Sequence, residues 1–154
     1  MRLLMLIVAL LMSGAAPAIA EPLDDGITAY EKGDYATALR LWRPLAERGI
    51  AEAQSRLGLL YDEGWGVPQD YATAVAWYRK AAEQRHAVAQ INLGSSYEAG
   101  TGVPQDYVLA HMWFNLAAVK GNDFAIAARD RVASKMTPAQ IAEAQNLARE
   151  WKPK

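Results

Sequence analysis

Apolar and small residues recur at helical spacing in two adjacent segments, 51–63 and 71–82. In the first segment, Ala53, Leu57 and Tyr61 follow one another at intervals of four, which places them on one face of a helix. In the second, the apolar residues follow steps of three and four. The sequence between them, GWGVPQD, contains two glycines and a proline and cannot continue a helix. The pattern therefore predicts two helices joined by a turn.

The same block returns 36 residues later in the chain. Residues 87–122 align with residues 51–86 without a gap, and 17 of the 36 positions are identical. An internal repeat of this length is typical of a solenoid, in which each unit buries its apolar face against its neighbours. Such arrays usually bind other proteins and rarely carry chemistry, so the repeat favours an interaction module.

A less regular segment precedes the two repeats. Residues 21–50 are expected to form an N-terminal capping unit, because the sequence that starts at Asp34 lies 36 positions before its counterpart at Asp70. Its first helix is expected to be about one turn shorter than those of the full repeats, near residues 24–32. Terminal units of a solenoid are commonly atypical because they close the stack.

Residues 123–154 are expected to close the other end as C-terminal capping helices. The stretch 124–133 continues the phase of a first helix, and a further helix follows a capping box made by Thr137 and Gln140. That last helix should cover the open apolar edge of the second full repeat. Residues 152–154, Lys-Pro-Lys, are expected to be a solvated basic tail.

The first 20 residues have the pattern of a secretory signal peptide. A positive charge at Arg2 precedes an apolar run over residues 3–12, and the small-x-small sequence AIA ends at Ala20. The apolar run is far shorter than the roughly 20 residues that span a bilayer. The pattern predicts cleavage after Ala20 and a periplasmic or secreted product of residues 21–154; an uncleaved N-terminal anchor is the alternative.

Composition narrows the possible chemistry. The chain contains no cysteine, which excludes disulfides, thiolate metal sites, cysteine nucleophiles and a lipid-modified cysteine. The formal net charge is −1 for the whole chain, and removing Arg2 with the signal peptide makes it −2. A balance so near neutrality gives no attraction to nucleic acid or to an anionic membrane.

No group of residues in the sequence forms a recognisable catalytic or metal site. The histidines, His86 and His111, are not spaced as ligands, and a metal site needs several converging donors. No serine lies in a Gly-x-Ser-x-Gly context. Aspartates recur at one position of three units, which is expected of helix caps rather than of a catalytic group: Asp34, Asp70 and Asp106. We therefore expect no cofactor, no metal and no enzymatic activity.

The repeated pattern A-x-A-Q-x-x-L-G-x-x-Y-x-x-G-x-G-V-P-Q-D-Y-x-x-A-x-x-W-[YF]-x-x-A-A resembles the Sel1-like repeat, a longer-looped relative of the tetratricopeptide repeat. Residues 51–86 and 87–122 match it well, and residues 24–50 resemble the shorter tetratricopeptide-type unit. The resemblance implies an all-α, right-handed superhelical solenoid of antiparallel helix pairs, and a protein-interaction scaffold of an exported bacterial type. Cysteine-rich family members have been linked to β-lactams, and a chain without cysteine does not inherit that link.

By analogy with tetratricopeptide repeats, the first helix of each pair lines the concave face. Four carboxylates among its positions predict an acidic groove suited to a basic or extended peptide, and an ordinary solvated face is the alternative. Trp65 replaces Thr101 of the other loop, so it is either a partner anchor or a side chain folded back on the neighbouring helix. The positions expected to be exposed are Glu52, Ser55, Leu59, Asp62 and Glu63 in one unit and Val88, Ile91, Ser95, Glu98 and Ala99 in the next.

The sequence leaves three hypotheses of function. The first is an exported, non-enzymatic scaffold that binds a protein or peptide partner, as a monomer or with weak self-association. The second is an envelope hydrolase or cell-wall enzyme, supported only by the predicted location and by the family's β-lactam history. The third is a self-assembling structural protein, because two full repeats leave modest buried area and end-to-end packing is possible.

Overall fold

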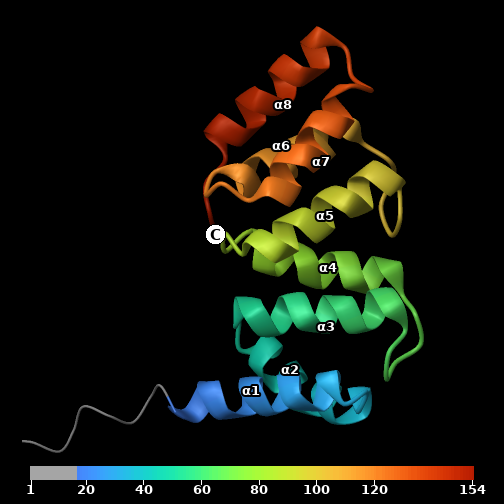
Figure 1. Cartoon of the computed structure of the whole chain (residues 1–154), viewed down its shortest axis with the longest axis vertical. Helices are drawn as coiled ribbons and strands as arrows, with labels where there is room; N and C mark the ends of the chain where they lie inside the picture. Colours follow the sequence, from blue (N-terminus) through green and yellow to red (C-terminus); the bar gives the residue numbers. More distant parts are fainter. Residues whose placement is uncertain (1–16) are drawn as a thin grey trace, which may run out of the picture.

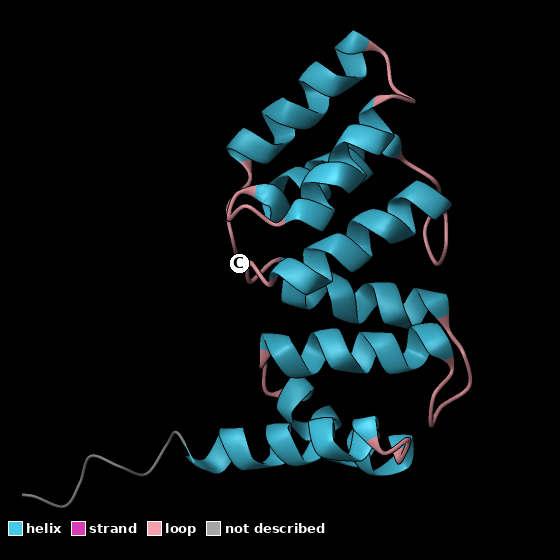
Figure 2. Cartoon of the chain, viewed as in Figure 1, coloured by secondary structure: helices cyan, strands magenta, loops and turns pink. Residues whose placement is uncertain are grey.

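A computed structural model describes residues 17–154, and this part of the chain contains helices and no strand (Figures 1 and 2). The predicted all-α class is therefore confirmed. Residues 1–16, which hold the positive charge and the apolar run of the predicted signal peptide, lie outside the described residues. The helices are α1 (Pro17–Glu31), α2 (Tyr35–Glu47), α3 (Ala51–Glu63), α4 (Tyr71–Ala82), α5 (Ala87–Ala99), α6 (Tyr107–Ala118), α7 (Asp123–Ala133) and α8 (Pro138–Glu150).

Each helix from α1 to α6 packs against the next one in the chain, so the helices form a solenoid of antiparallel pairs (Figure 1). The pairs are α1/α2, α3/α4 and α5/α6, with α7 and α8 at the end. Helix α8 packs against α6, and it covers part of the apolar surface that the last full repeat leaves open. Helix α8 therefore lies against the last full repeat, where the sequence predicts a capping helix.

The helices of each full repeat approach closely because glycine faces an aromatic ring. A Cβ atom on Gly58 would lie 2.6 Å from the ring of Tyr78, and one on Gly94 would lie 2.9 Å from the ring of Phe114. Real side-chain carbons do not approach so closely, so both positions need glycine. The two rings are nearly or fully buried, and they fill the space that the missing side chains leave.

The loops within the two full repeats have the same geometry. Each begins at a glycine in the left-handed region, Gly64 (φ 69°) and Gly100 (φ 73°). In each, the side-chain amide of a glutamine donates to a carbonyl of the preceding helix: Gln69 to Asp62 at 2.7 Å and Gln105 to Glu98 at 2.8 Å. The loop therefore belongs to the repeated scaffold.

Side chains cap the helices as the sequence predicts. The carboxylates of the repeated aspartates accept hydrogen bonds from backbone N–H groups three residues on, at 3.0–3.1 Å. Thr137 and Gln140 form the predicted reciprocal capping box at the start of α8. These aspartates are structural, and a cap of this kind contributes about 1 kcal/mol to stability.

Helix α1 is longer than expected. It begins at Pro17 rather than near Asp24, and the prediction of a short first helix is wrong. The sequence Pro-Ala-Ile-Ala before Glu21 favours this start, because proline is tolerated at the first helical position and alanine is the best helix former. Pro22 then lies inside the helix, where its nitrogen cannot donate a hydrogen bond.

Residues 151–154, which we call the strap, return from the end of α8 to the end of α4. The backbone N–H of Lys154 donates to the carbonyl of Glu83 at 2.9 Å. The side-chain nitrogen Nζ of Lys154 lies 3.2 Å from Oε1 of the same residue. Residues 152–154 are exposed, as expected of a solvated tail, but Glu83 holds the last of them in place.

Candidate partner-binding surface

The first helices of the repeats present equivalent positions 36 residues apart, and α7 continues the series. The second residue of each helix is Glu52 in α3, Val88 in α5 and Phe124 in α7. We call the solvent-facing side of α3, α5 and α7 the A-helix face. The candidate residues from the sequence lie on α3 and α5, except Trp65, which lies in the loop after α3.

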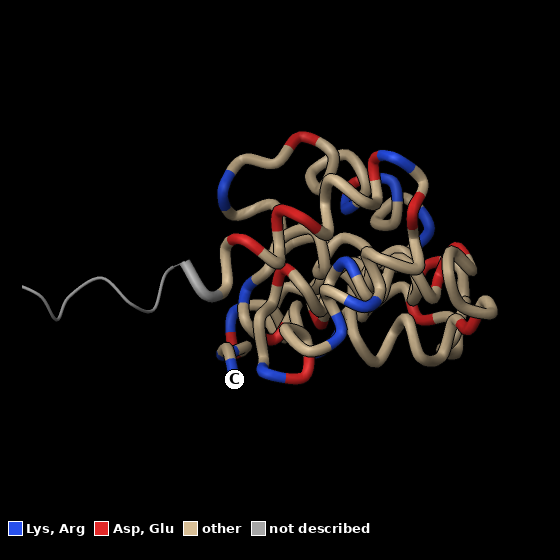
Figure 3. The backbone as a smooth tube through the Cα atoms, turned by 90° about the horizontal axis from the view of Figure 1, so that it is seen from below, with Lys and Arg blue, Asp and Glu red and all other residues tan. Residues whose placement is uncertain are grey.

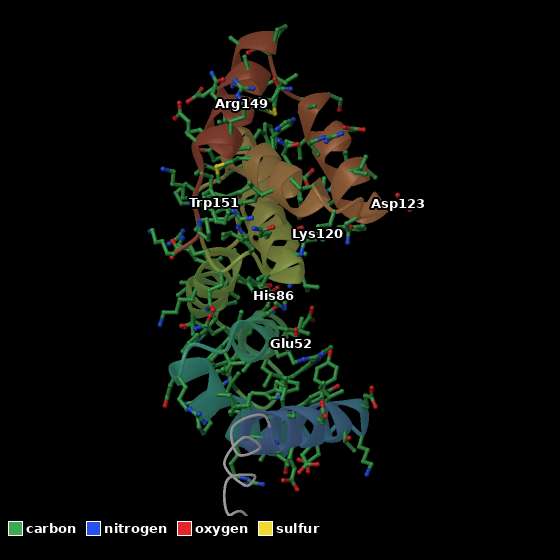
Figure 4. All side chains as sticks on the ribbon, turned by 90° about the vertical axis from the view of Figure 1, so that its left-hand side faces the viewer. Glu52, His86, Lys120, Asp123, Arg149 and Trp151 are labelled. Carbon is green, nitrogen blue, oxygen red and sulfur yellow. The ribbon has the colours of Figure 1, made fainter. Side chains whose placement is uncertain are left out.

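Glu52 does not lie free on this face. Its Oε2 atom is 2.7 Å from Nε2 of His86, and its Oε1 atom is 2.6 Å from Nε of Arg56. Partial burial opposes its ionisation, but the His86 bond and the Arg56 charge outweigh burial and lower the pKa of the Glu52 carboxyl. Figure 4 shows Glu52 and His86 on neighbouring units of the stack.

The carboxylates nearer the ends of α3 and α5 are also engaged, in a different way in each unit. The phenol of Tyr78 donates to Oδ2 of Asp62 at 3.1 Å. The next unit has Phe114 in place of that tyrosine, and its equivalent carboxylate, Glu98, binds Arg131 of α7 instead, at 2.6 Å. The carboxylate is therefore bound by a tyrosine hydroxyl in the first unit and by an arginine of α7 in the second.

Glu98 is the more strongly paired of these two acids. Lys135 also lies 3.1 Å from it, so two cations face one carboxylate. The Arg131 hydrogen bond lowers the pKa of Glu98 against a smaller effect of burial, and Lys135 adds to it. In Tyr78, burial first and the Asp62 charge second raise the pKa of the phenol.

These contacts change the electrostatic character of the predicted groove. Glu52, Asp62 and Glu98 each have an intramolecular partner, and Glu63 is the exposed member of the four carboxylates. Figure 3 shows acidic and basic residues interspersed over the described part of the chain. The A-helix face is therefore largely charge-compensated, and its remaining character comes from its apolar residues.

The structure places the other candidates at different depths. Ser55 is buried, with 4% of its surface exposed, so the expectation that it faces solvent is wrong. It follows Gln54, whose side-chain amide reaches back to the carbonyl of Ala46, and this turn of α3 faces the preceding unit. Ile91 is partly buried against the cores around α6 and α7. Leu59 and Ser95 are partly exposed, and Ala99 is exposed.

Two exposed apolar side chains mark the A-helix face. Val88 is 56% exposed and Phe124 is 59% exposed, although both occupy the same position of their helices. Val119, in the turn before α7, is 78% exposed. Of these residues, only Val88 is among the positions expected from the sequence to be exposed; the 36-residue period signals Phe124 as its next equivalent.

Trp65 folds back onto the preceding unit. Its ring stacks on that of Tyr35 with the centroids 4.9 Å apart and the planes at 12°, and it also contacts Tyr30. Thr101 takes its place in the next loop, and there Tyr71, the counterpart of Tyr35, is 40% exposed. Trp65 therefore covers Tyr35, and of its two alternatives the structure has the side chain folded back on the neighbouring helix.

The acidic and histidine side chains of residues 17–154 do not cluster into a site. No three acidic or histidine side chains of this part are arranged to hold a metal ion. His111 is 97% buried in α6, and its Nδ1 atom has no hydrogen-bond partner. No helix among these residues is both long and apolar enough for a membrane span.

The Sel1 repeat family model matches the chain in three segments, residues 23–50, 51–86 and 87–122. The chain belongs to the Sel1 repeat family. The first matched segment is the unit that resembles a tetratricopeptide repeat in sequence, so the N-terminal helix pair is also a Sel1 repeat.

Solved structures support the same fold. One is a protective antigen of uropathogenic Escherichia coli strains with an SLR fold; it is 32% identical over 86% of this chain, with a TM-score of 0.83. This Sel1 repeat protein spans only 29% of that antigen. Another is a Sel1 repeat protein from Oxalobacter formigenes, 35% identical over 75% of this chain and 90% of the other, with a TM-score of 0.66. No curated protein matches the sequence.

Proposed function

We propose that this Sel1 repeat protein is an exported, non-enzymatic scaffold that binds a protein or peptide partner on its A-helix face. Sel1 repeat proteins generally mediate interactions between proteins. The observation that carries the proposal is the contrast within the repeats. Most of the buried positions agree between units, as at Gly58 and Gly94, whereas solvent-accessible positions on the first helix differ, as at Glu52 and Val88. A common scaffold with a varied surface is what selective binding requires.

The contacts on this face indicate the kind of partner. Because most of its carboxylates are already paired, a partner gains little from basic groups alone, and exposed pairs contribute at most about 1 kcal/mol each. Val88 and Phe124 offer exposed apolar area instead, and Glu63 offers an exposed charge at the end of α3. The best-fitting partner is therefore a segment with apolar side chains and an occasional basic one.

Binding is tested with substitutions that leave the paired carboxylates intact. Val88→Asp and Glu63→Lys change exposed side chains, whereas changes at Glu52, Asp62 or Glu98 would also break intramolecular contacts. Ala76→Asp, on the exposed side of α4, is the matched control. Pull-down from an envelope fraction should recover a partner with wild type and with Ala76→Asp, and lose it with the other two. Equal recovery with all variants would contradict binding on the A-helix face.

Export rests on the signal-peptide pattern, and α1 adds a physical argument. Cleavage after Ala20 would move Pro22 from a helix interior to the first turn, where its missing N–H leaves no bond unmade. It would also remove Ile19, which lies at the margin of the N-terminal core. Similarity to a protective antigen also supports an exported location.

Export has its own test, independent of binding. Mass spectrometry of the protein from fractionated cells should find an N-terminus at Glu21 in the periplasmic or secreted fraction. An intact chain that starts at Met1 and stays in the cytoplasm would contradict this part of the proposal and leave the binding part standing.

A further inference from the structure

The turn between α4 and α5 differs from its two counterparts in the array. Positions 49, 85 and 121 are equivalent in the 36-residue period, and all three lie in the left-handed region, at φ values of 90°, 66° and 79°. Gly49 and Gly121 adopt this conformation without strain, whereas Arg85 is the only non-glycine residue of the described chain with a positive φ. A strained residue that persists is a reason to ask what its side chain does.

The side chain of Arg85 reaches the strap. Its guanidinium carbon lies 5.8 Å from the centre of the Trp151 ring, within the range of a cation–π contact. The same ring meets Trp113 of α6 edge to face, with the centroids 6.0 Å apart. An arginine on the turn and a tryptophan on the next repeat thus receive the first residue of the strap.

Glu83, two residues before Arg85, receives the other end of the strap. Its carbonyl accepts from the backbone N–H of Lys154, and its carboxylate pairs with the Nζ atom. The Lys154 side chain is 76% exposed, so the ion pair is weak and the backbone bond carries more of the contact. We call Glu83, Arg85 and Trp113 the seat.

The strap has the form of a peptide ligand. Trp151 has φ −65° and ψ 137°, close to the values of a polyproline II segment, and Pro153 favours the same conformation. Such segments lose little conformational entropy on binding and are recognised by aromatic-lined sites. Helix α8 is held separately, because Ala144 is fully buried, so the strap can leave the seat while the helix stays packed.

We propose that the seat is a receptor for an extended segment with a tryptophan followed three residues later by a lysine, that the strap fills it in cis, and that a partner segment of this chemistry binds by displacing the strap. The strap itself supplies the argument for the ligand, since it shows which side chains the seat accepts. This inference does not rest on the A-helix face, because the seat lies at the turn between α4 and α5.

The test uses a labelled peptide with the sequence of residues 148–154 and capped ends. Trp151→Ala combined with Lys154→Ala empties the seat in the full chain, and fluorescence anisotropy then measures binding of the peptide. We expect saturable binding to this variant, with binding about two- to fivefold weaker when Arg85→Gly is added and weaker still when the peptide carries alanine for tryptophan. Wild type should bind weakly, because its own strap competes.

Fluorine NMR of the intact, fluorotryptophan-labelled chain gives a second readout that does not depend on emptying the seat. Excess peptide should move the Trp151 resonance to a solvent-exposed position. No peptide binding, binding insensitive to Arg85→Gly, or a Trp151 resonance that excess peptide leaves in place would overturn the proposal. Strap-dependent dimers in light scattering would also overturn it, because they would assign the seat to a second copy of the chain.

Discussion

The imidazole of His86 caps one helix and ties it to the preceding repeat through Glu52. Its Nδ1 atom accepts from the backbone N–H of Ala89 at 3.2 Å, which places the proton on Nε2. That Nε2 then donates to the Glu52 carboxylate at 2.7 Å. One side chain thus accepts a hydrogen bond from a backbone N–H group in the first turn of α5 and links this helix to α3.

His86→Ala should destabilise the protein by about 1–2 kcal/mol, because it removes both a helix cap and a bond to a carboxylate. His86→Asn is the matched variant, since asparagine caps the equivalent position before α7, where Asn122 accepts from Ala125. It should recover most of the cap and only lose the Glu52 bond. Urea denaturation of the three proteins measures the difference, and equal stability of both variants would contradict the capping role.

Gly58→Ala should destabilise the protein by about 1–3 kcal/mol, because the added Cβ meets the buried ring of Tyr78. Gly94→Ala should cost less, since its Cβ would lie slightly farther from Phe114. In a double-mutant cycle, Gly58→Ala should cost less in a Tyr78→Leu background than in wild type, because the ring that the added Cβ meets is gone. Thermal unfolding provides the measurement, and a neutral Gly58→Ala would show that the helices do not need this close approach.

The protein should become less stable as the pH is lowered, because of the buried imidazole of His111. Burial, and then the positive charge of Arg129, lower the pKa of this imidazole below its ordinary value of 6.5, while Asp130 acts in the opposite direction. In the unfolded chain the group takes up a proton near that ordinary pKa, whereas in the folded chain it does so only at lower pH. The free energy of unfolding therefore decreases as pH falls below about 6.5 and levels off below the folded pKa.

His111→Leu should remove this component of the pH dependence. Denaturation between about pH 7.5 and pH 5 should show a smaller loss of stability for the variant than for wild type. His86→Asn serves as the comparison, because it removes the other histidine and leaves the buried one. A variant that keeps the full wild-type slope would assign the pH dependence to other groups.

Arg85→Gly and Gly121→Arg should have opposite consequences for strain. The left-handed conformation costs a side chain about 1 kcal/mol, so Arg85→Gly relieves that strain but also loses a cation–π contact of about 0.5–1 kcal/mol, and stability should barely change. Gly121→Arg introduces the strain at a position where nothing lies within 4 Å of the added Cβ, and should destabilise the protein by about 1 kcal/mol. If calorimetry shows that Arg85→Gly stabilises the protein by the whole strain energy of about 1 kcal/mol, the Arg85 side chain contributes nothing to stability.

Repetition made much of the fold predictable. Residues that agree 36 positions apart, such as Gly58 and Gly94 or Asp70 and Asp106, identified the helix contacts and the caps. The start of α1 was missed because a signal-peptide pattern and a helical pattern overlap in the same residues before Glu21.

The surface was harder to predict because its contacts join different repeats. Nothing in the local sequence indicates that Glu98 pairs with Arg131 of α7, 33 residues on, or that Glu83 receives Lys154, 71 residues on. The acidic groove was inferred from residue types alone, and the structure shows that a carboxylate on this face is usually paired. The repeat does indicate that Val88 and Phe124 are equivalent, because they lie 36 residues apart, and both are exposed.

Site-specific photo-crosslinking in the native cell tests the central claim most directly. A photoreactive amino acid is placed at position 88 or 124 of the A-helix face, and at position 76 on α4 as the control. The account predicts the same cross-linked partner from 88 and 124 and none from 76. No cross-linked species, or the same species from all three positions, would contradict a scaffold that binds through its A-helix face.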